Sequence, residues 1–157
     1  MVSYVRSLSV GAQDVVVAGN ARSGSILYRS KGECSGCHRV GGRGGLLGPD
    51  LSDVGWIRSP EHIETSLLRP GDVVDDSYRK VAVELKSGGE VVGLLRNEST
   101  YSIQMLDETG KLRSFEKSDL ASLDKPSDSL MPAFDDLFSP GEIQDLVAYL
   151  YSLKGEQ

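Results

Sequence analysis

The 157-residue sequence is poor in cysteine, histidine and long apolar stretches. No apolar run approaches the roughly 20 residues that a membrane-spanning helix needs, so we expect no membrane span in this chain. The net charge is −6, and such an acidic chain lacks the basic surface that general nucleic-acid binding requires. With 39% hydrophobic and 25% charged residues, the composition is that of a globular protein of about one domain.

Both cysteines lie in one stretch, "GECSGCHRV", residues 32–40, and a histidine follows the second of them directly. A disulfide oxidoreductase places such a pair at a helix start within a βαβ pattern, whereas here a helical segment precedes it and a glycine-rich one follows. A structural zinc site needs four ligands, and the other histidine, His62, has no paired spacing with these residues. A disulfide between residues three apart would close a very small loop and stabilise the fold little.

Covalent haem attachment accounts for all three residues. The thiols of Cys34 and Cys37 would add to the two vinyl groups of a haem, and His38 would bind the iron, because C-x-x-C-H is the signature of this attachment. The sequence therefore predicts a covalently bound haem c. Attachment of this kind normally takes place outside the cytoplasm. We therefore expect a periplasmic or otherwise exported protein whose leader is absent from this chain.

Three side chains are candidates for the second axial ligand of the iron. Met105 is in phase with Ile103 on an expected strand, which indicates sheet core, and His62 stands in the first turn of an expected helix, where a solvated or capping role fits. Met131 lies in "DSLMPAFDDLF", where no periodicity explains it, and we predict that it is the ligand. Thioether ligation favours Fe(II) and fills the sixth site of the iron, which indicates electron transfer rather than oxygen chemistry.

Helices are expected at three places. One begins near Asn20, one runs from Ser59 to Pro70, and the last follows Ser139 with an S-x-x-E capping box and an apolar stripe. Between residues 78 and 123 apolar and polar residues alternate and break at turn-forming residues. This pattern predicts a meander of about four short antiparallel strands, too few to be stable without help from the helical part.

With these residues placed, the chain resembles the class I c-type cytochromes over residues 20–72 and 125–155. The motifs that carry the resemblance are "SILYRSKGECSGCHRV", "GPDLS", "SLMPAF" and "EIQDLVAYLYSL". The resemblance implies a mostly α fold, α+β overall once the inserted small β-meander is included, in which the first and last helices cross near Tyr28 and Tyr149. It also implies that the carbonyl of Pro49 holds the second ring nitrogen of His38. The meander before Met131 is similar to that of a narrower group of haem-binding domains, often fused to large periplasmic dehydrogenases.

Two further expectations concern organisation and haem contacts. Residues 1–18 are expected to be an N-terminal extension or linker, and residues 19–157 a cytochrome c domain with its β-insertion at about 78–123. Haem propionates need hydrogen-bond donors, and the candidates are Arg43, Arg58 and the neighbouring Trp56.

The predicted function is that of an electron carrier or relay domain, not an enzyme. Its partners would be a dehydrogenase-type redox donor and a downstream acceptor, with the chain either free-standing or part of a larger dehydrogenase or multi-haem chain. The alternative is a haem-based sensor or peroxidase-like enzyme in which Met131 leaves the iron readily. A third interpretation makes residues 78–123 an interaction module to which the haem-binding part is tethered.

Overall fold

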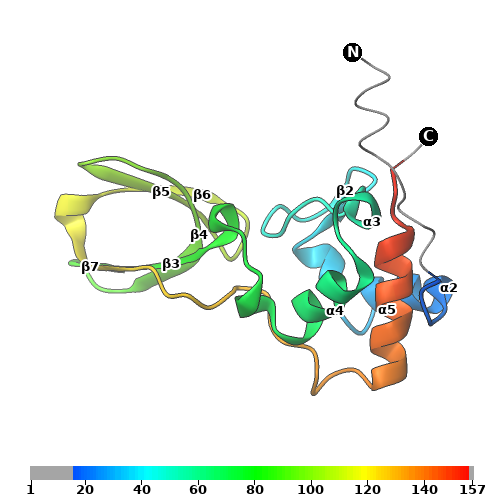
Figure 1. Cartoon of the computed structure of the whole chain (residues 1–157). Helices are drawn as coiled ribbons and strands as arrows, with labels where there is room; N and C mark the ends of the chain where they lie inside the picture. Colours follow the sequence, from blue (N-terminus) through cyan, green and yellow to red (C-terminus); the bar gives the residue numbers. More distant parts are fainter. Residues whose placement is uncertain (1–15, 156–157) are drawn as a thin grey trace, which may run out of the picture.

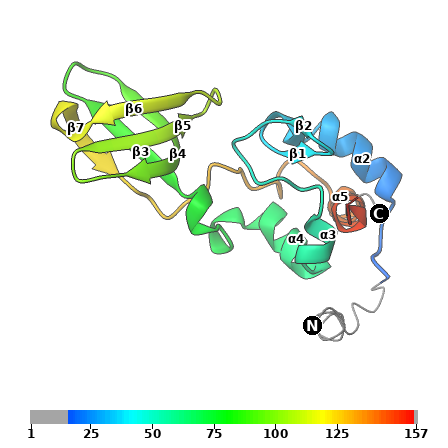
Figure 2. The ribbon, with the colours of Figure 1, turned by 90° about the horizontal axis from the view of Figure 1, so that it is seen from above.

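The computed structural model describes residues 16–155 and places four α-helices to one side of an antiparallel sheet (Figures 1 and 2). The helices are α2 (Ala21–Arg29), α3 (Val54–Ile57), α4 (Pro60–Leu68) and α5 (Pro140–Ser152). Most of the predicted N-terminal extension, residues 1–18, lies outside the described residues. Within residues 16–155, no helix combines the length and the apolar character that crossing a membrane requires.

Capping residues start three of these helices at the predicted positions. The Asn20 side chain accepts hydrogen bonds from two first-turn amides of α2. Ser59 caps α4, and Ser139 and Glu142 form the predicted capping box of α5. A cap supplies acceptors for amides that a helix leaves unpaired, so the local sequence is sufficient to fix where each of these helices begins.

The helices α2 and α5, the first and last that the structure describes, touch at Gly24. A Cβ built at Gly24 would lie 1.9 Å from the backbone oxygen of Asp145, so only glycine permits this approach. The rings of Tyr28 and Tyr149 pack nearby with their centroids 5.5 Å apart, which is the predicted contact. The other buried members of this helical core are Ile63, Leu67, Phe134, Phe138, Ile143, Leu146, Val147 and Leu150.

A five-stranded antiparallel sheet occupies the middle of the chain. Its strands are β3 (Lys80–Leu85), β4 (Glu90–Glu98), β5 (Ser102–Asp107), β6 (Leu112–Glu116) and β7 (Leu120–Asp124), in the spatial order β6-β5-β4-β3-β7. The strands β3 to β6 form the expected meander, and β7 returns to pair with β3, with Val83 opposite Leu123. The chain is therefore α+β, and the prediction of a mostly α fold is wrong.

The sheet is larger than the predicted small insertion and has an apolar core of its own. Val81, Val83, Ile103, Met105 and Leu120 are buried in this sheet core, which is a cluster distinct from the helical core. Leu120 belongs to β7, the strand that was not predicted. A sheet with its own buried face has an internal source of stability and does not depend wholly on packing against the helices.

Two chain segments connect the sheet to the helices. The first, residues 69–79, contains the 3₁₀ turns η2 (Pro70–Asp72) and η3 (Asp76–Tyr78). The second, residues 125–139, is hereafter the Met131 segment. It leaves β7 and is fastened to α4 where the amide of Phe134 donates to the carbonyl of Leu67 over 3.0 Å.

Candidate haem-attachment site

Both cysteines and His38 lie on one turn of the chain. The 3₁₀ turn η1 (Cys34–Gly36) begins after Glu33, which adopts a left-handed conformation with φ 48°. The amides of Cys37 and His38 both donate to the carbonyl of Cys34, over 3.2 and 2.8 Å. Neither thiol forms a disulfide; Cys34 is partly buried and Cys37 is exposed. The two sulfurs and the imidazole are thus gathered by local backbone hydrogen bonds.

The environment of Cys34 does not favour a reactive thiolate. Burial raises the pKa of its thiol to about 11, whereas redox-active C-x-x-C cysteines have lowered pKa values. A metal ion held by protein side chains alone is also unsupported, because residues 16–155 contain no group of three or more His, Cys, Asp or Glu side chains that could hold one. A neutral thioether, by contrast, suits a partly buried apolar position.

His38 is buried, with 9% of its surface exposed, and is held from two sides. Its Nδ1 lies 3.0 Å from the carbonyl oxygen of Pro49, the contact that the resemblance implies. An Nδ1–H donating to this carbonyl leaves Nε2 as the nitrogen with a free lone pair. Burial lowers the pKa of His38, against the opposing effect of the Pro49 bond, which favours the neutral imidazole that metals bind. The hydroxyl of Tyr28 donates to the backbone carbonyl of His38 over 3.2 Å.

The histidine loop, residues 45–49, closes over this turn. The amide of Gly48 donates to the carbonyl of Cys37 over 2.8 Å, and the amide of Gly45 donates to that of Ser35 over 3.0 Å. A Cβ built at Gly48 would lie only 2.4 Å from Cε1 of His38, so the backbone of the loop packs directly on the imidazole ring. Loop and ring are therefore fitted to each other, and glycine at position 48 is required for that fit.

Between the cysteine turn and the histidine loop, β1 (Arg39–Val40) and β2 (Arg43–Gly44) pair as a short antiparallel hairpin. Nε of Arg39 is a buried nitrogen without a hydrogen-bond partner in residues 16–155. The sequence pattern did not identify Gly48 and Tyr28 as contacts of His38, nor the unpaired Nε of Arg39. The available signals were the position of Arg39 directly after His38 and the glycine that precedes Pro49.

The three candidate second ligands occupy different environments. Met105 is fully buried in the sheet core, which confirms its interpretation as a core residue. His62 lies in the first turn of α4 and is partly exposed, and its own amide donates to the Ser59 cap. Met131 is partly buried and packs on the helical core, the cluster on which Cys34 also packs. Met131 and Cys34 therefore pack on the same core cluster.

The predicted propionate donors all lie at the surface. Arg43 is exposed in β2, and Arg58 is exposed at the end of α3. The indole of Trp56 is 57% exposed, its Nε1 donates to the carbonyl of Lys154, and the Lys154 ammonium stands 5.3 Å from the ring centroid. The structure does not gather these three side chains around His38.

The donor set fits a covalently attached haem. Two unpaired thiols and a buried imidazole with a free Nε2 lie on one turn, and a thioether side chain packs on the same apolar core. Comparison of the chain with protein-family models gives no match, and comparison with curated protein sequences gives none either.

Proposed function

We propose that the protein carries one electron at a time on a haem c attached to Cys34 and Cys37, with His38 and Met131 as axial ligands. The observation that carries this proposal is the Nδ1 contact of His38 with Pro49 at 3.0 Å, on the turn that also holds both thiols. The Pro49 contact engages Nδ1 and leaves Nε2 as the imidazole nitrogen with a free lone pair. When bound, haem c would supply reversible one-electron chemistry at iron.

The residues of the chain would set the properties of that site. The Pro49 carbonyl fixes the orientation of the His38 ring and increases its basicity as a ligand. Met131, which packs on the helical core, would offer a soft sulfur that favours the reduced metal. No nucleophile or general base is needed for this role, so it is that of a carrier or relay domain rather than an enzyme.

The partners follow from the same chemistry. A carrier needs a redox donor and an acceptor, and the group that the chain resembles suggests a dehydrogenase-type donor, in a larger dehydrogenase or a multi-haem chain. Covalent attachment would require export, so the proposed location is the periplasm or an equivalent compartment.

The test is expression of the chain together with export and haem-attachment machinery. We expect a red protein whose denatured mass is increased by one haem and whose reduced spectrum is that of a low-spin c-type haem. A Cys34→Ala, Cys37→Ala double variant is the matched control and should remain at the mass of the polypeptide. A colourless wild-type protein of unchanged mass would refute the proposal. A high-spin spectrum with rapid CO or peroxide binding would replace the carrier with the sensor or peroxidase-like alternative.

A further inference from the structure

The strand β4 reaches the histidine loop through one side chain, Arg96. Its Nη2 donates to the carbonyl of Leu46 over 3.1 Å, and its guanidinium lies 5.7 Å from the ring centroid of Tyr78. The register between β4 and β5 shifts between Leu95 and Asn97, so Arg96 is the extra, unpaired residue of a β-bulge. Bulges redirect a side chain out of the regular alternation of a strand, and here the redirected group is the arginine that contacts the loop.

Leu46 belongs to the same five-residue loop that holds the histidine. Within this loop, Gly48 packs on the ring of His38 and the Pro49 carbonyl accepts from its Nδ1. Any displacement of the loop therefore changes the Nδ1 contact. An open cleft of about 480 Å³ is lined by residues of both parts, among them Arg39, Gly48, Tyr78 and Leu112. The Arg96 hydrogen bond to Leu46 is a direct polar link between the sheet and the loop at this cleft.

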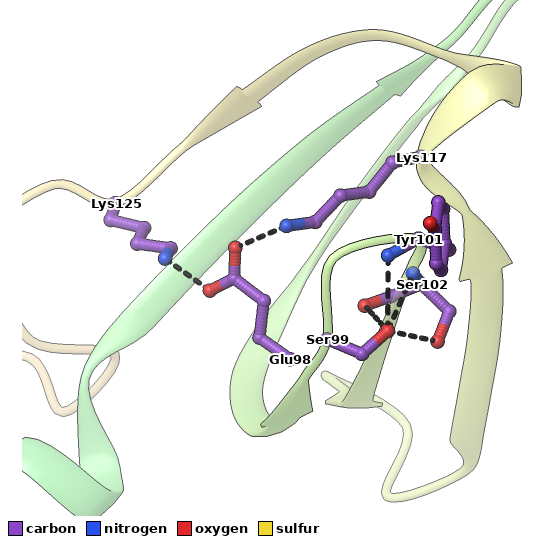
Figure 3. Close-up of polar contacts among 6 residues, drawn as sticks. All are labelled: Glu98, Ser99, Tyr101, Ser102, Lys117 and Lys125. Carbon is purple, nitrogen blue, oxygen red and sulfur yellow. Dashed lines mark hydrogen bonds and ion pairs between the residues drawn. The ribbon is translucent and has the colours of Figure 1, made fainter.

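Two residues further along β4, Glu98 reaches the Met131 segment. Its carboxylate accepts from the ammonium of Lys117 over 2.7 Å and from that of Lys125, the first residue of the Met131 segment (Figure 3). A second ion pair joins Lys80 of β3 to Asp128 over 2.8 Å, three residues before Met131. The sheet thus fastens this segment at two points between β7 and the methionine.

We propose that the β3–β7 sheet positions both candidate iron ligands, His38 through Arg96 and Met131 through Glu98 and Lys80. This inference rests on the proposed function for its redox consequences, but its structural part does not. The sheet core gives the strands a fixed geometry, whereas the histidine loop and the Met131 segment have no regular secondary structure of their own. A rigid element with side-chain contacts to both segments would hold both ligands at constant orientation.

The first test compares Arg96→Met with Arg79→Met by amide hydrogen exchange in the full chain as purified. Arg79 is a neighbouring surface arginine that pairs with Asp76, so its variant removes the same charge without touching the loop. In Arg96→Met, the amides of Gly45 and Gly48 should exchange about threefold to tenfold faster, because a lost hydrogen bond loosens the loop, while sheet amides keep their rates. Unchanged loop rates would overturn the proposal. This readout requires no haem, so it remains decisive even if the proposed function fails.

The second test uses the reduction potential of the haem-loaded protein. In Arg96→Met the bond between Pro49 and His38 should weaken, which makes the imidazole less basic and raises the reduction potential of the haem. At a fixed solution potential, the ratio of oxidised to reduced protein should then shift by about twofold to tenfold toward the reduced form. Loss of a positive charge alone would lower the potential and would be screened by salt. A downward, salt-sensitive shift equal to that of Arg79→Met would therefore contradict positioning through the loop.

The third test addresses the Met131 segment with Glu98→Gln, and Glu90→Gln at the exposed start of β4 serves as the control. Glu98→Gln should weaken the charge-transfer absorption of thioether-bound ferric haem and speed its replacement by imidazole added to the solution at least threefold, whereas Glu90→Gln should leave both unchanged. Equal rates of ligand replacement in the two variants would contradict the positioning of Met131 through Glu98.

Discussion

The hydroxyl of Tyr28 donates to the backbone carbonyl of His38 over 3.2 Å and so ties α2 to the turn that holds both cysteines. The tyrosine ring packs against Tyr149 of α5 at the same time. Burial is the main cause that raises the pKa of the Tyr28 hydroxyl far above its usual value, so this group remains a proton donor at any physiological pH. The Tyr28 side chain therefore connects the contact between α2 and α5 to the backbone of His38, the candidate iron ligand.

Tyr28→Phe keeps the ring packing and removes only this hydrogen bond. We expect the free energy of unfolding to fall by about 0.5–1.5 kcal/mol, because the His38 carbonyl loses a buried donor. Urea unfolding measures this change, and Tyr101→Phe is the control, since Tyr101 is 78% exposed. If the two variants are equally stable, the Tyr28 bond makes no net contribution.

Gly48→Ala tests the fit between the histidine loop and the imidazole. The added Cβ would lie 2.4 and 2.5 Å from Cε1 and Nδ1 of His38, so ring and loop must separate and the Pro49 contact must lengthen. Overpacking of this kind costs about 1–3 kcal/mol. We expect lower stability and a changed chemical shift for the His38 ring protons. Gly71→Ala is the matched control, because its Cβ would meet no atom within 4 Å. If both substitutions lower the stability equally, close packing on His38 is not the reason that position 48 requires glycine.

The sequence was a good guide wherever local chemistry determines structure. Asn20, Ser59 and Ser139 cap their helices as predicted, because a cap acts on amides two or three residues away. Met105 was correctly assigned to the sheet core because strand alternation alone fixes which face it occupies.

Long-range pairing could not be predicted in the same way. The strand β7 has five residues, and it is recognisable only through its pairing with β3, where Val83 lies opposite Leu123. The mostly α fold that the resemblance implied is wrong, because the sheet has five strands and dominates the middle of the chain. The role of Arg96 was also invisible, because a bulge depends on the register of β4 against β5 and has no signature in the sequence of one strand.

The ion pairs of Glu98 predict a defined pH dependence. Hydrogen bonds from Lys117 and Lys125 lower the pKa of the Glu98 carboxyl from 4.5 to about 2. The folded-state pKa is thus depressed, so the contribution to stability is complete above about pH 4.5 and is lost as the pH falls through about 2. The site is partly exposed, so the contribution should not exceed about 1 kcal/mol.

Urea unfolding of wild type and Glu98→Gln across this pH range measures that contribution. The difference in unfolding free energy should be present at neutral pH, shrink in acid and decrease with added salt. Glu90→Gln again serves as the control. A difference that is constant from neutral pH to about pH 2 would show that the carboxylate charge is not its source.

The two internal methionines give the sharpest test of iron ligation. Met131→Ala should open the sixth site of the haem-loaded protein, abolish the thioether charge-transfer absorption and lower the potential, because sulfur ligation favours Fe(II). Met105→Ala should leave the spectrum unchanged and reduce the free energy of unfolding by about 2–5 kcal/mol, because it empties a fully buried position in the sheet core. Absorbance spectra and urea unfolding of both variants separate the two roles. If Met131→Ala retains the wild-type spectrum, the sixth ligand is another residue, and His62→Ala is then the variant that should lose it.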